Sequence, residues 1–302
     1  DTYSTSCFGS ALFKDLLKRD YEVDKWLIFG TDSSNWSELL DAIDESHHNE
    51  LIETYDVIYD EENKGISEEL LSQWEDTLQK YIPAIRLIKV DPLDYEVYIN
   101  HMINEIPDRK TGIVLDITHS LRHMPVIIAF SLMTLKYVKD ISDITVYYGA
   151  YELRDRNSGA PAPVLEIDII NTLVEFTENL AIYNNSANFI GVMDSLGIQD
   201  TEETYFRLEM NRQPRKKLKE ISQRLDEISS VENYKGSIAN YMKKEIEPLI
   251  GATLHERMVE RAVFFFKKKQ YLKALILLYE GIILMIGRKY GYGSSLGYKS
   301  RE

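Results

Sequence analysis

The periodicity of apolar and polar positions changes near residue 168, which divides the chain into two parts. Before that point, short apolar runs alternate with amphipathic segments, a pattern that predicts alternating strands and helices. Strands are predicted at residues 25–29, 51–58, 84–90, 112–116 and 144–150, and helices at 5–19, 35–44, 67–80, 94–104 and 122–137. Such alternation indicates a doubly wound α/β domain with a parallel sheet. A turn sequence at 157–159 and an apolar arm at 164–167 predict a closing β-hairpin.

After residue 168 the strand signals stop, and helical periodicity continues to residue 290. Four apolar residues, for example, share one face of a predicted helix. They are Leu218, Ile221, Leu225 and Ile228. Two further helices are predicted near 253–268 and 270–289. We therefore expect an α/β domain over residues 1–180, followed by an all-α domain over residues 181–302.

The composition is that of a soluble globular protein, with 44% hydrophobic and 28% charged residues over 302 positions. No apolar run reaches the roughly 20 residues that a membrane-spanning helix needs. Cys7 is the single cysteine, so one chain can form no disulfide framework and no multi-cysteine metal site. The histidines also lack the spacing of a zinc site. These features predict a cytoplasmic protein without a metal cofactor and without a membrane partner.

The chain is acidic, because 49 Asp and Glu residues outnumber 35 Lys and Arg residues to give a net charge of −14. A uniformly acidic protein would repel nucleic acid. The basic residues, however, cluster at 212–219, 267–269 and 288–289, all in the C-terminal third. For any single cluster, a solvated helix face is the favoured explanation, and contact with a nucleic acid is the alternative.

One polar turn connects the predicted strand 112–116 to an apolar helix that has a proline near its first turn. A helix N-terminus carries partial positive charge and free N–H groups, and it therefore attracts anions. Several side chains in the turn can also donate hydrogen bonds to phosphate oxygens. The candidate ligand-binding residues of this turn are Asp116, Thr118, His119, Ser120, Leu121, Arg122 and Pro125. We expect Asp116 to anchor the turn through its N–H groups rather than to act as a base. The simpler alternative is a capped strand-to-helix connection.

A second polar turn follows the predicted strand 25–29. Its candidate ligand-binding residues are Gly30, Thr31, Asp32, Ser33, Ser34 and Trp36. Asn35 and Glu38 have the spacing of a capping box for the helix that follows, so this turn too could be only a well-capped helix start. In open parallel sheets, however, ligands bind outside the carboxyl ends of the strands. Two polar turns at two such ends therefore predict one site.

Together the two turns resemble the CARF domain of CRISPR-associated effectors. The residues that carry the resemblance are Gly-Thr-x-x-Ser-x-Trp at 30–36 and Asp-Ile-Thr-His-Ser-x-Arg-x-x-Pro at 116–125. The similarity continues at Tyr147-Tyr-Gly-Ala-Tyr-Glu152 and at Pro163-Val164, so it spans roughly residues 1–180. Ser120 stands where the family usually has glycine, which affects how closely the backbone can approach a ligand.

The resemblance implies a Rossmann-like CARF domain that binds cyclic oligoadenylate, such as cyclic tetra- or hexa-adenylate, made by type III CRISPR complexes. Many CARF domains are fused to a C-terminal HEPN ribonuclease domain, and the helices after residue 253 resemble a HEPN helical hairpin. The family therefore implies a ligand-activated endoribonuclease that cleaves single-stranded RNA in antiviral defence. Because an even-numbered cyclic ligand can have two-fold symmetry, we also expect a homodimer.

HEPN ribonucleases use an Arg-x4–6-His motif, and this sequence does not contain one. No catalytic residue is therefore assigned, and we expect the chain to lack its C-terminal end as well as an N-terminal strand. Two other functions stay open. One is a ring nuclease that cleaves the cyclic ligand in the CARF pocket, with Thr118, Ser120 or Arg122 stabilising the developing charge. The other is a non-enzymatic CARF sensor or regulator.

Overall fold

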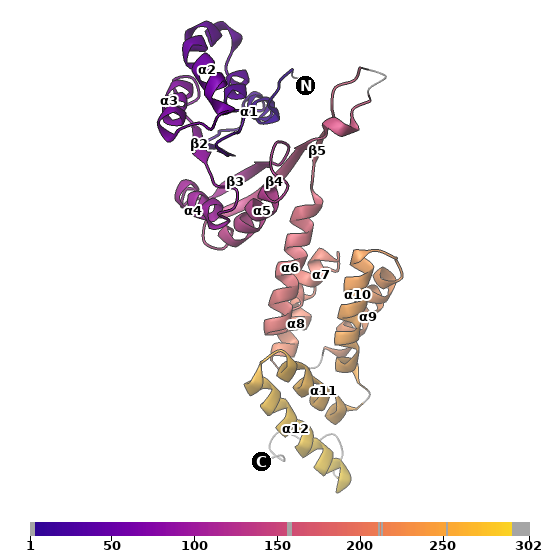
Figure 1. The fold of residues 1–302 in the computed structure, drawn as a ribbon. Helices are drawn as coiled ribbons and strands as arrows, with labels where there is room; N and C mark the ends of the chain where they lie inside the picture. The colour runs from indigo at the N-terminus through magenta and orange to yellow at the C-terminus, as the bar shows by residue number, and fades with distance from the viewer. Residues whose placement is uncertain (1–3, 156–158, 211, 213, 252, 292–302) are drawn as a thin grey trace. The chain divides into compact units, whose positions relative to one another are not determined.

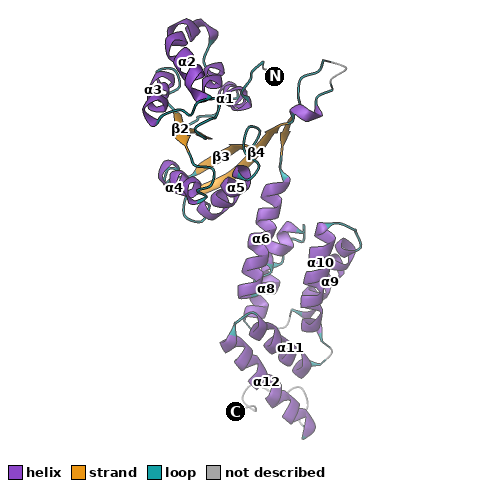
Figure 2. Ribbon diagram, in the orientation of Figure 1, coloured by secondary structure: helices purple, strands orange, loops and turns teal. Residues whose placement is uncertain are grey.

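The structure is a computed structural model that describes residues 4–155, 159–210, 212, 214–251 and 253–291 (Figure 1). The chain forms two compact units, Asp1–Asn171 and Thr172–Glu302. The first unit mixes strands and helices, whereas the second is helical (Figure 2). The predicted fold class, an α/β domain with a parallel sheet followed by an all-α domain, is confirmed. Helix α6 (Ile169–Ser186) runs through both the unit boundary and the predicted domain boundary at 180.

The strands of the first unit form two hydrogen-bonded sheets. Strand β1 (Trp26–Gly30) pairs in parallel with β2 (Ile85–Lys89). Strand β3 (Thr111–Asp116) pairs in parallel with β4 (Ile141–Gly149), and β4 pairs in antiparallel with β5 (Val164–Glu166). The predicted second hairpin arm is therefore present as β5. Of the residues that we predicted for its turn, 157 and 158 lie outside the described residues.

The helices of this unit are α1 (Phe8–Lys18), α2 (His48–Glu62), α3 (Glu68–Gln79), α4 (Glu96–Glu105), α5 (Met124–Leu135) and the 3₁₀ helices η1 (Trp36–Ala42), η2 (Glu45–His47) and η3 (Tyr151–Leu153). Several of them pack on the two faces of the β1–β2 pair. Trp26 and Ile28 of β1 pack into a core built by α1, η1, α2 and α3. Leu27 and Phe29 pack into a second core with α4, α5, β3 and β4. Both sheets therefore contribute to this second core, although they share no strand.

Three predictions for this unit are wrong. The predicted strand 51–58 lies inside helix α2, because its buried Leu51 and Ile58 are seven residues apart, two helical turns. Its β-branched Ile52 and Val57, which suggested a strand, are exposed. The predicted helix 35–44 is the 3₁₀ helix η1. The predicted single sheet is also wrong, since the strands form two sheets, β1–β2 and β3–β4–β5.

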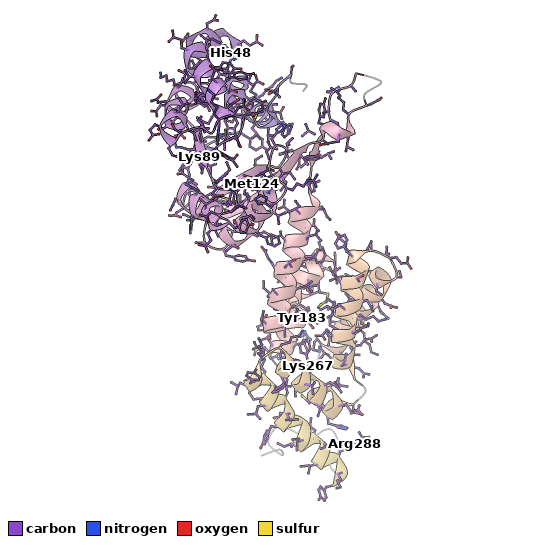
Figure 3. All side chains as sticks on the ribbon, viewed as in Figure 1. His48, Lys89, Met124, Tyr183, Lys267 and Arg288 are labelled. Atoms are coloured by element: carbon purple, nitrogen blue, oxygen red, sulfur yellow. The ribbon has the colours of Figure 1, made fainter. Side chains whose placement is uncertain are left out.

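The second unit packs its helices around one core. After α6 these are α7 (Ile190–Ser195), α8 (Glu202–Glu209), α9 (Arg215–Ser229), α10 (Tyr234–Ile246), η4 (Glu247–Ile250), α11 (Leu254–Lys267) and α12 (Tyr271–Lys289). Tyr183, labelled in Figure 3, is fully buried in this core. Its hydroxyl donates to Glu245 Oε2 at 2.9 Å. Lys268 is also buried, with its Nζ 2.9 Å from the same Glu245 oxygen and 3.9 Å from the centre of the Tyr183 ring.

Among the described residues, no helix has the length and apolar character needed to cross a membrane.

Candidate ligand site

The turn after β1 is held together by residues of the Gly-Thr-x-x-Ser-x-Trp motif itself. The Thr31 backbone N–H donates to Ser34 Oγ at 2.8 Å, and the Trp36 indole Nε1 donates to the Thr31 carbonyl oxygen at 3.0 Å. The Trp36 ring lies so close to Gly30 that a β-carbon there would be 2.6 Å from Trp36 Cζ2. Trp36 is only 2% exposed. We conclude that Gly30, Ser34 and Trp36 fix the conformation of this turn and do not face a ligand.

Two other residues of this turn are available to a ligand. Asp32 and Ser33 are exposed. The carbonyl oxygen of Asp32 accepts a hydrogen bond from the Ile66 N–H at 2.9 Å, which fixes the backbone of the turn. The Asp32 side chain remains exposed to solvent. The predicted capping box is not formed, because Asn35 makes no side-chain cap and its Nδ2 instead donates to the Glu38 side chain at 3.2 Å.

The turn after β3 is anchored by Asp116 and Thr118. Asp116 Oδ1 accepts the Thr118 N–H at 2.8 Å, as expected for an anchoring rather than a basic role. The Thr118 hydroxyl oxygen in turn accepts the Gly149 N–H at 2.8 Å, which ties the turn to the end of β4. Burial raises the pKa of Asp116 above its ordinary value, while the hydrogen bonds from Thr118 and the charge of nearby His119 act in the opposite direction.

Beyond this anchor the turn presents its side chains to solvent. His119, Ser120, Leu121 and Arg122 are all exposed. Helix α5 starts at Met124, two residues later than predicted, with Pro125 in its first turn (Figure 3 labels Met124). The side chain of His123 does not cap this helix, and its Nε2 lies 2.8 Å from the Pro92 carbonyl oxygen. The donors available to a ligand are therefore side chains of residues 119–122, because the Met124 N–H at the start of α5 donates to the Leu121 carbonyl oxygen at 2.9 Å and Pro125 has no N–H.

The start of helix α1 also borders this site, which the sequence did not reveal. A β-carbon on Gly9 would lie 3.4 Å from Asp116 Oδ2 and 3.8 Å from the Trp26 ring. The Phe8 ring lies against Gly149, where a β-carbon would be 2.7 Å from it. Burial also raises the pKa of the Cys7 thiol at this helix start. A glycine at the start of a helix carries no local signal of such contacts.

The two predicted turns lie at the carboxyl ends of β1 and β3 within one unit. Each is internally ordered, but among the described residues no hydrogen bond joins residues 30–36 to residues 116–125. No group of three or more His, Cys, Asp and Glu side chains that could hold a metal ion occurs among those residues. The chemistry that the turns offer is hydrogen-bond donation to an anion, from the exposed residues His119, Ser120 and Arg122.

The sequence that forms this fold and these turns matches a known protein family. Residues 2–153 match the family described as CRISPR system endoribonuclease Csx1, CARF domain. The chain therefore belongs to the CARF-domain family of CRISPR ancillary proteins, as its motifs predicted.

The chain is also similar to CRISPR-associated protein MJ1674 of Methanocaldococcus jannaschii. The two are 25% identical over 313 aligned residues, which include 93% of this chain and 48% of the relative. The chain thus spans about half the length of the curated relative that it matches. The similarity supports a role in a CRISPR system and does not identify the ligand or an activity.

Proposed function

We propose that the CARF domain binds a cyclic oligoadenylate, of the size of cyclic tetra- or hexa-adenylate, and that this ligand activates an endoribonuclease for single-stranded RNA. The observation that carries the proposal is the turn at 116–122. Hydrogen bonds of Asp116 and Thr118 hold its backbone in place, while His119, Ser120 and Arg122 are exposed beside the start of α5. A rigid turn that presents exposed side-chain donors beside a helix N-terminus suits phosphate groups.

The binding step has a direct test. Replacing His119 or Arg122 with Ala should weaken cyclic oligoadenylate binding by about 1.5–3 kcal/mol, the contribution of a hydrogen bond to a charged group. Folding should survive, because both side chains are exposed. Lys110→Ala is the matched control, since this exposed residue comes just before β3 and loses one positive charge at the opposite end of the strand. Unchanged affinity in both turn variants, measured by titration calorimetry, would remove the proposed pocket.

We also propose that the protein is a homodimer. Helix α5, which directly follows the turn, exposes apolar residues one helical turn apart, with Val126 55% and Phe130 65% exposed. A two-fold contact between such helices would bring two copies of the turn to one cyclic ligand. Sedimentation velocity should show a dimer, and Phe130→Asp should shift it toward monomer. A 35.1 kDa monomer at micromolar concentration, with and without ligand, would contradict the proposal.

The ribonuclease step rests on the helical second unit and on the description of the matched family, because no Arg-x4–6-His motif occurs in the chain. An RNase in a cell should be nearly silent without its activator. Moving an equilibrium from mostly off to mostly on takes about 5.5 kcal/mol of differential binding, which a ligand that contacts both chains of a dimer can supply. Full-length protein should cleave single-stranded RNA only with cyclic tetra- or hexa-adenylate. Equal cleavage without ligand would refute gating, and no cleavage in either condition would favour a ring nuclease or a non-enzymatic sensor.

A further inference from the structure

Arg261 of helix α11 is a buried cation with unused hydrogen-bond donors. It is 1% exposed. Its Nη1 donates to the Arg212 carbonyl oxygen at 2.9 Å. Its Nε and Nη2 have no hydrogen-bond partner anywhere in the described part of the chain. Unpaired buried donors destabilise a fold, and a charged donor does so more strongly than a neutral one. The unpaired Arg261 side chain therefore lowers the stability of the fold unless a ligand accepts its hydrogen bonds.

The surroundings of Arg261 are also positive. Arg257, one turn earlier in α11, is near enough to act on Arg261, and Arg215 of helix α9 acts in the same way on Arg257. Burial, with a further contribution from Arg257, lowers the pKa of Arg261 to about 10, so this guanidinium is still protonated at neutral pH. Within the described residues, neither Arg261 nor Arg215 forms an ion pair with a carboxylate. Arg261 and Arg215 therefore carry positive charge that no carboxylate of the described residues pairs, whereas Glu256 acts on Arg257 in the direction opposite to Arg215.

Helix α9 begins beside this group. Arg261 donates to the carbonyl of Arg212, which lies three residues before the first residue of the helix, Arg215. The first turn of α9 has no acidic residue, and its N-cap residue, Pro214, provides no side-chain hydrogen bond. The N–H groups of a first helical turn lack intrahelical partners and carry partial positive charge. Both the helix start and the buried guanidinium are therefore suited to an anionic ligand.

We propose that Arg261, Arg215 and the first turn of α9 bind a phosphate group. A guanidinium matches phosphate by paired N–H donors, and a phosphate oxygen can also accept from helix N–H groups. The site does not depend on cyclic oligoadenylate binding or on RNA cleavage. Exposed basic residues continue outward from it along α9, namely Lys216, Lys217 and Lys219. The phosphate therefore comes either from free inorganic phosphate or from the backbone of single-stranded RNA.

Thermal melts followed by circular dichroism at 222 nm test the site itself. The full chain should melt at a higher temperature in phosphate than in chloride buffer of equal ionic strength. Arg261→Met keeps the side-chain bulk but removes the charge and should abolish this shift. Arg224→Gln is the matched control, because it removes one exposed positive charge from α9 about 14 Å along the helix from its start. This variant should keep the phosphate shift.

Fluorescence anisotropy with a short single-stranded RNA identifies the source of the phosphate. If the backbone binds here, Arg261→Met and Arg215→Gln should each weaken RNA binding about tenfold, and each should lower the salt dependence by about one counter-ion. If only free phosphate binds here, RNA affinity stays unchanged while the thermal shift is lost. If Arg261→Met fails to fold, Arg215→Gln provides the same comparison. A phosphate shift equal to that of the unmodified chain in both variants would overturn the proposal.

Discussion

Replacing Gly30 with Ala should destabilise the CARF domain, because the space above this glycine is filled by an indole ring. A β-carbon at position 30 would lie 2.6 Å from Cζ2 and 2.7 Å from Cη2 of Trp36. Carbon atoms pack at about 3.5–4.0 Å, so the ring would have to move by nearly 1 Å. Trp36 is 2% exposed and its Nε1 is hydrogen-bonded to the Thr31 carbonyl oxygen. The ring therefore has no free direction in which to move.

The expected cost follows from two opposing contributions. Overpacking a core typically costs about 1–3 kcal/mol, and a pinned ring points to the upper part of that range. Against this, Gly→Ala stabilises by about 0.4–1 kcal/mol, because it restricts the unfolded chain. The net destabilisation is therefore about 1–2.5 kcal/mol, which corresponds to a decrease in melting temperature of roughly 2–10 °C for a unit of this size.

Tryptophan fluorescence isolates this effect, because all three tryptophans, Trp26, Trp36 and Trp74, lie in the first unit. Gly112→Ala in β3 is the matched control. The three atoms nearest to its β-carbon would all belong to the exposed Asp143 side chain, the first at 3.3 Å, and this carboxylate can move aside. The control should leave the melting temperature unchanged or raise it slightly. If Gly30→Ala melts as high as the control, the packing explanation for this glycine is wrong.

Three further substitutions probe the polar contacts. Thr118→Val leaves the buried Gly149 N–H without its acceptor and should cost about 1–3 kcal/mol by the same fluorescence melts, whereas Thr118→Ser should cost less; equal losses would contradict this. Burial raises the pKa of Asp116, so the folded chain binds its proton more tightly than the unfolded chain does, and ionisation opposes folding at neutral pH. Asp116→Asn should therefore melt higher at pH 7, by a margin that shrinks as the pH falls toward about 4; a constant margin would refute the sign. Lys268→Met should lower the free energy of unfolding by about 3–5 kcal/mol, measured by melts at 222 nm, because it leaves the Glu245 carboxylate without its ion-pair partner. Adding Glu245→Gln should recover part of that loss; no recovery would show that the ion pair is unimportant.

The sequence predicted those elements whose local signals agree with their packing. Helix α3 is an example, because Ser67 precedes it as the N-cap and its hydroxyl accepts the Leu70 N–H at 3.2 Å. Its buried Leu71, Trp74 and Leu78 recur at helical spacing. Strand β3 was predicted equally well by its β-branched run. In both cases the residue pattern within one segment determines the element.

Elements that depend on distant contacts were less predictable. In α2 the β-branched Ile52 and Val57 favour a strand locally, but burial of Leu51 and Ile58 selects the helix. The division of the strands into two sheets also depends on long-range pairing, which no local pattern encodes. For the candidate site, the sequence identified both turns and missed their supports, such as the start of α1, where a β-carbon on Gly9 would lie 3.4 Å from Asp116 Oδ2.

Each of the two turns contains residues that fix the backbone and other residues that are exposed to a ligand. Residues with buried or doubly used polar groups, such as Trp36, Asp116 and Thr118, bind other parts of the chain and so fix the backbone. Exposed residues such as Arg122 make no such contact within the described part of the chain and can act on a ligand. Ser120 belongs to the second group: it is exposed and has no positive φ, so serine replaces the usual glycine without backbone strain and adds a hydroxyl donor. Substitutions in the first group should therefore change stability before binding, and those in the second should change binding alone.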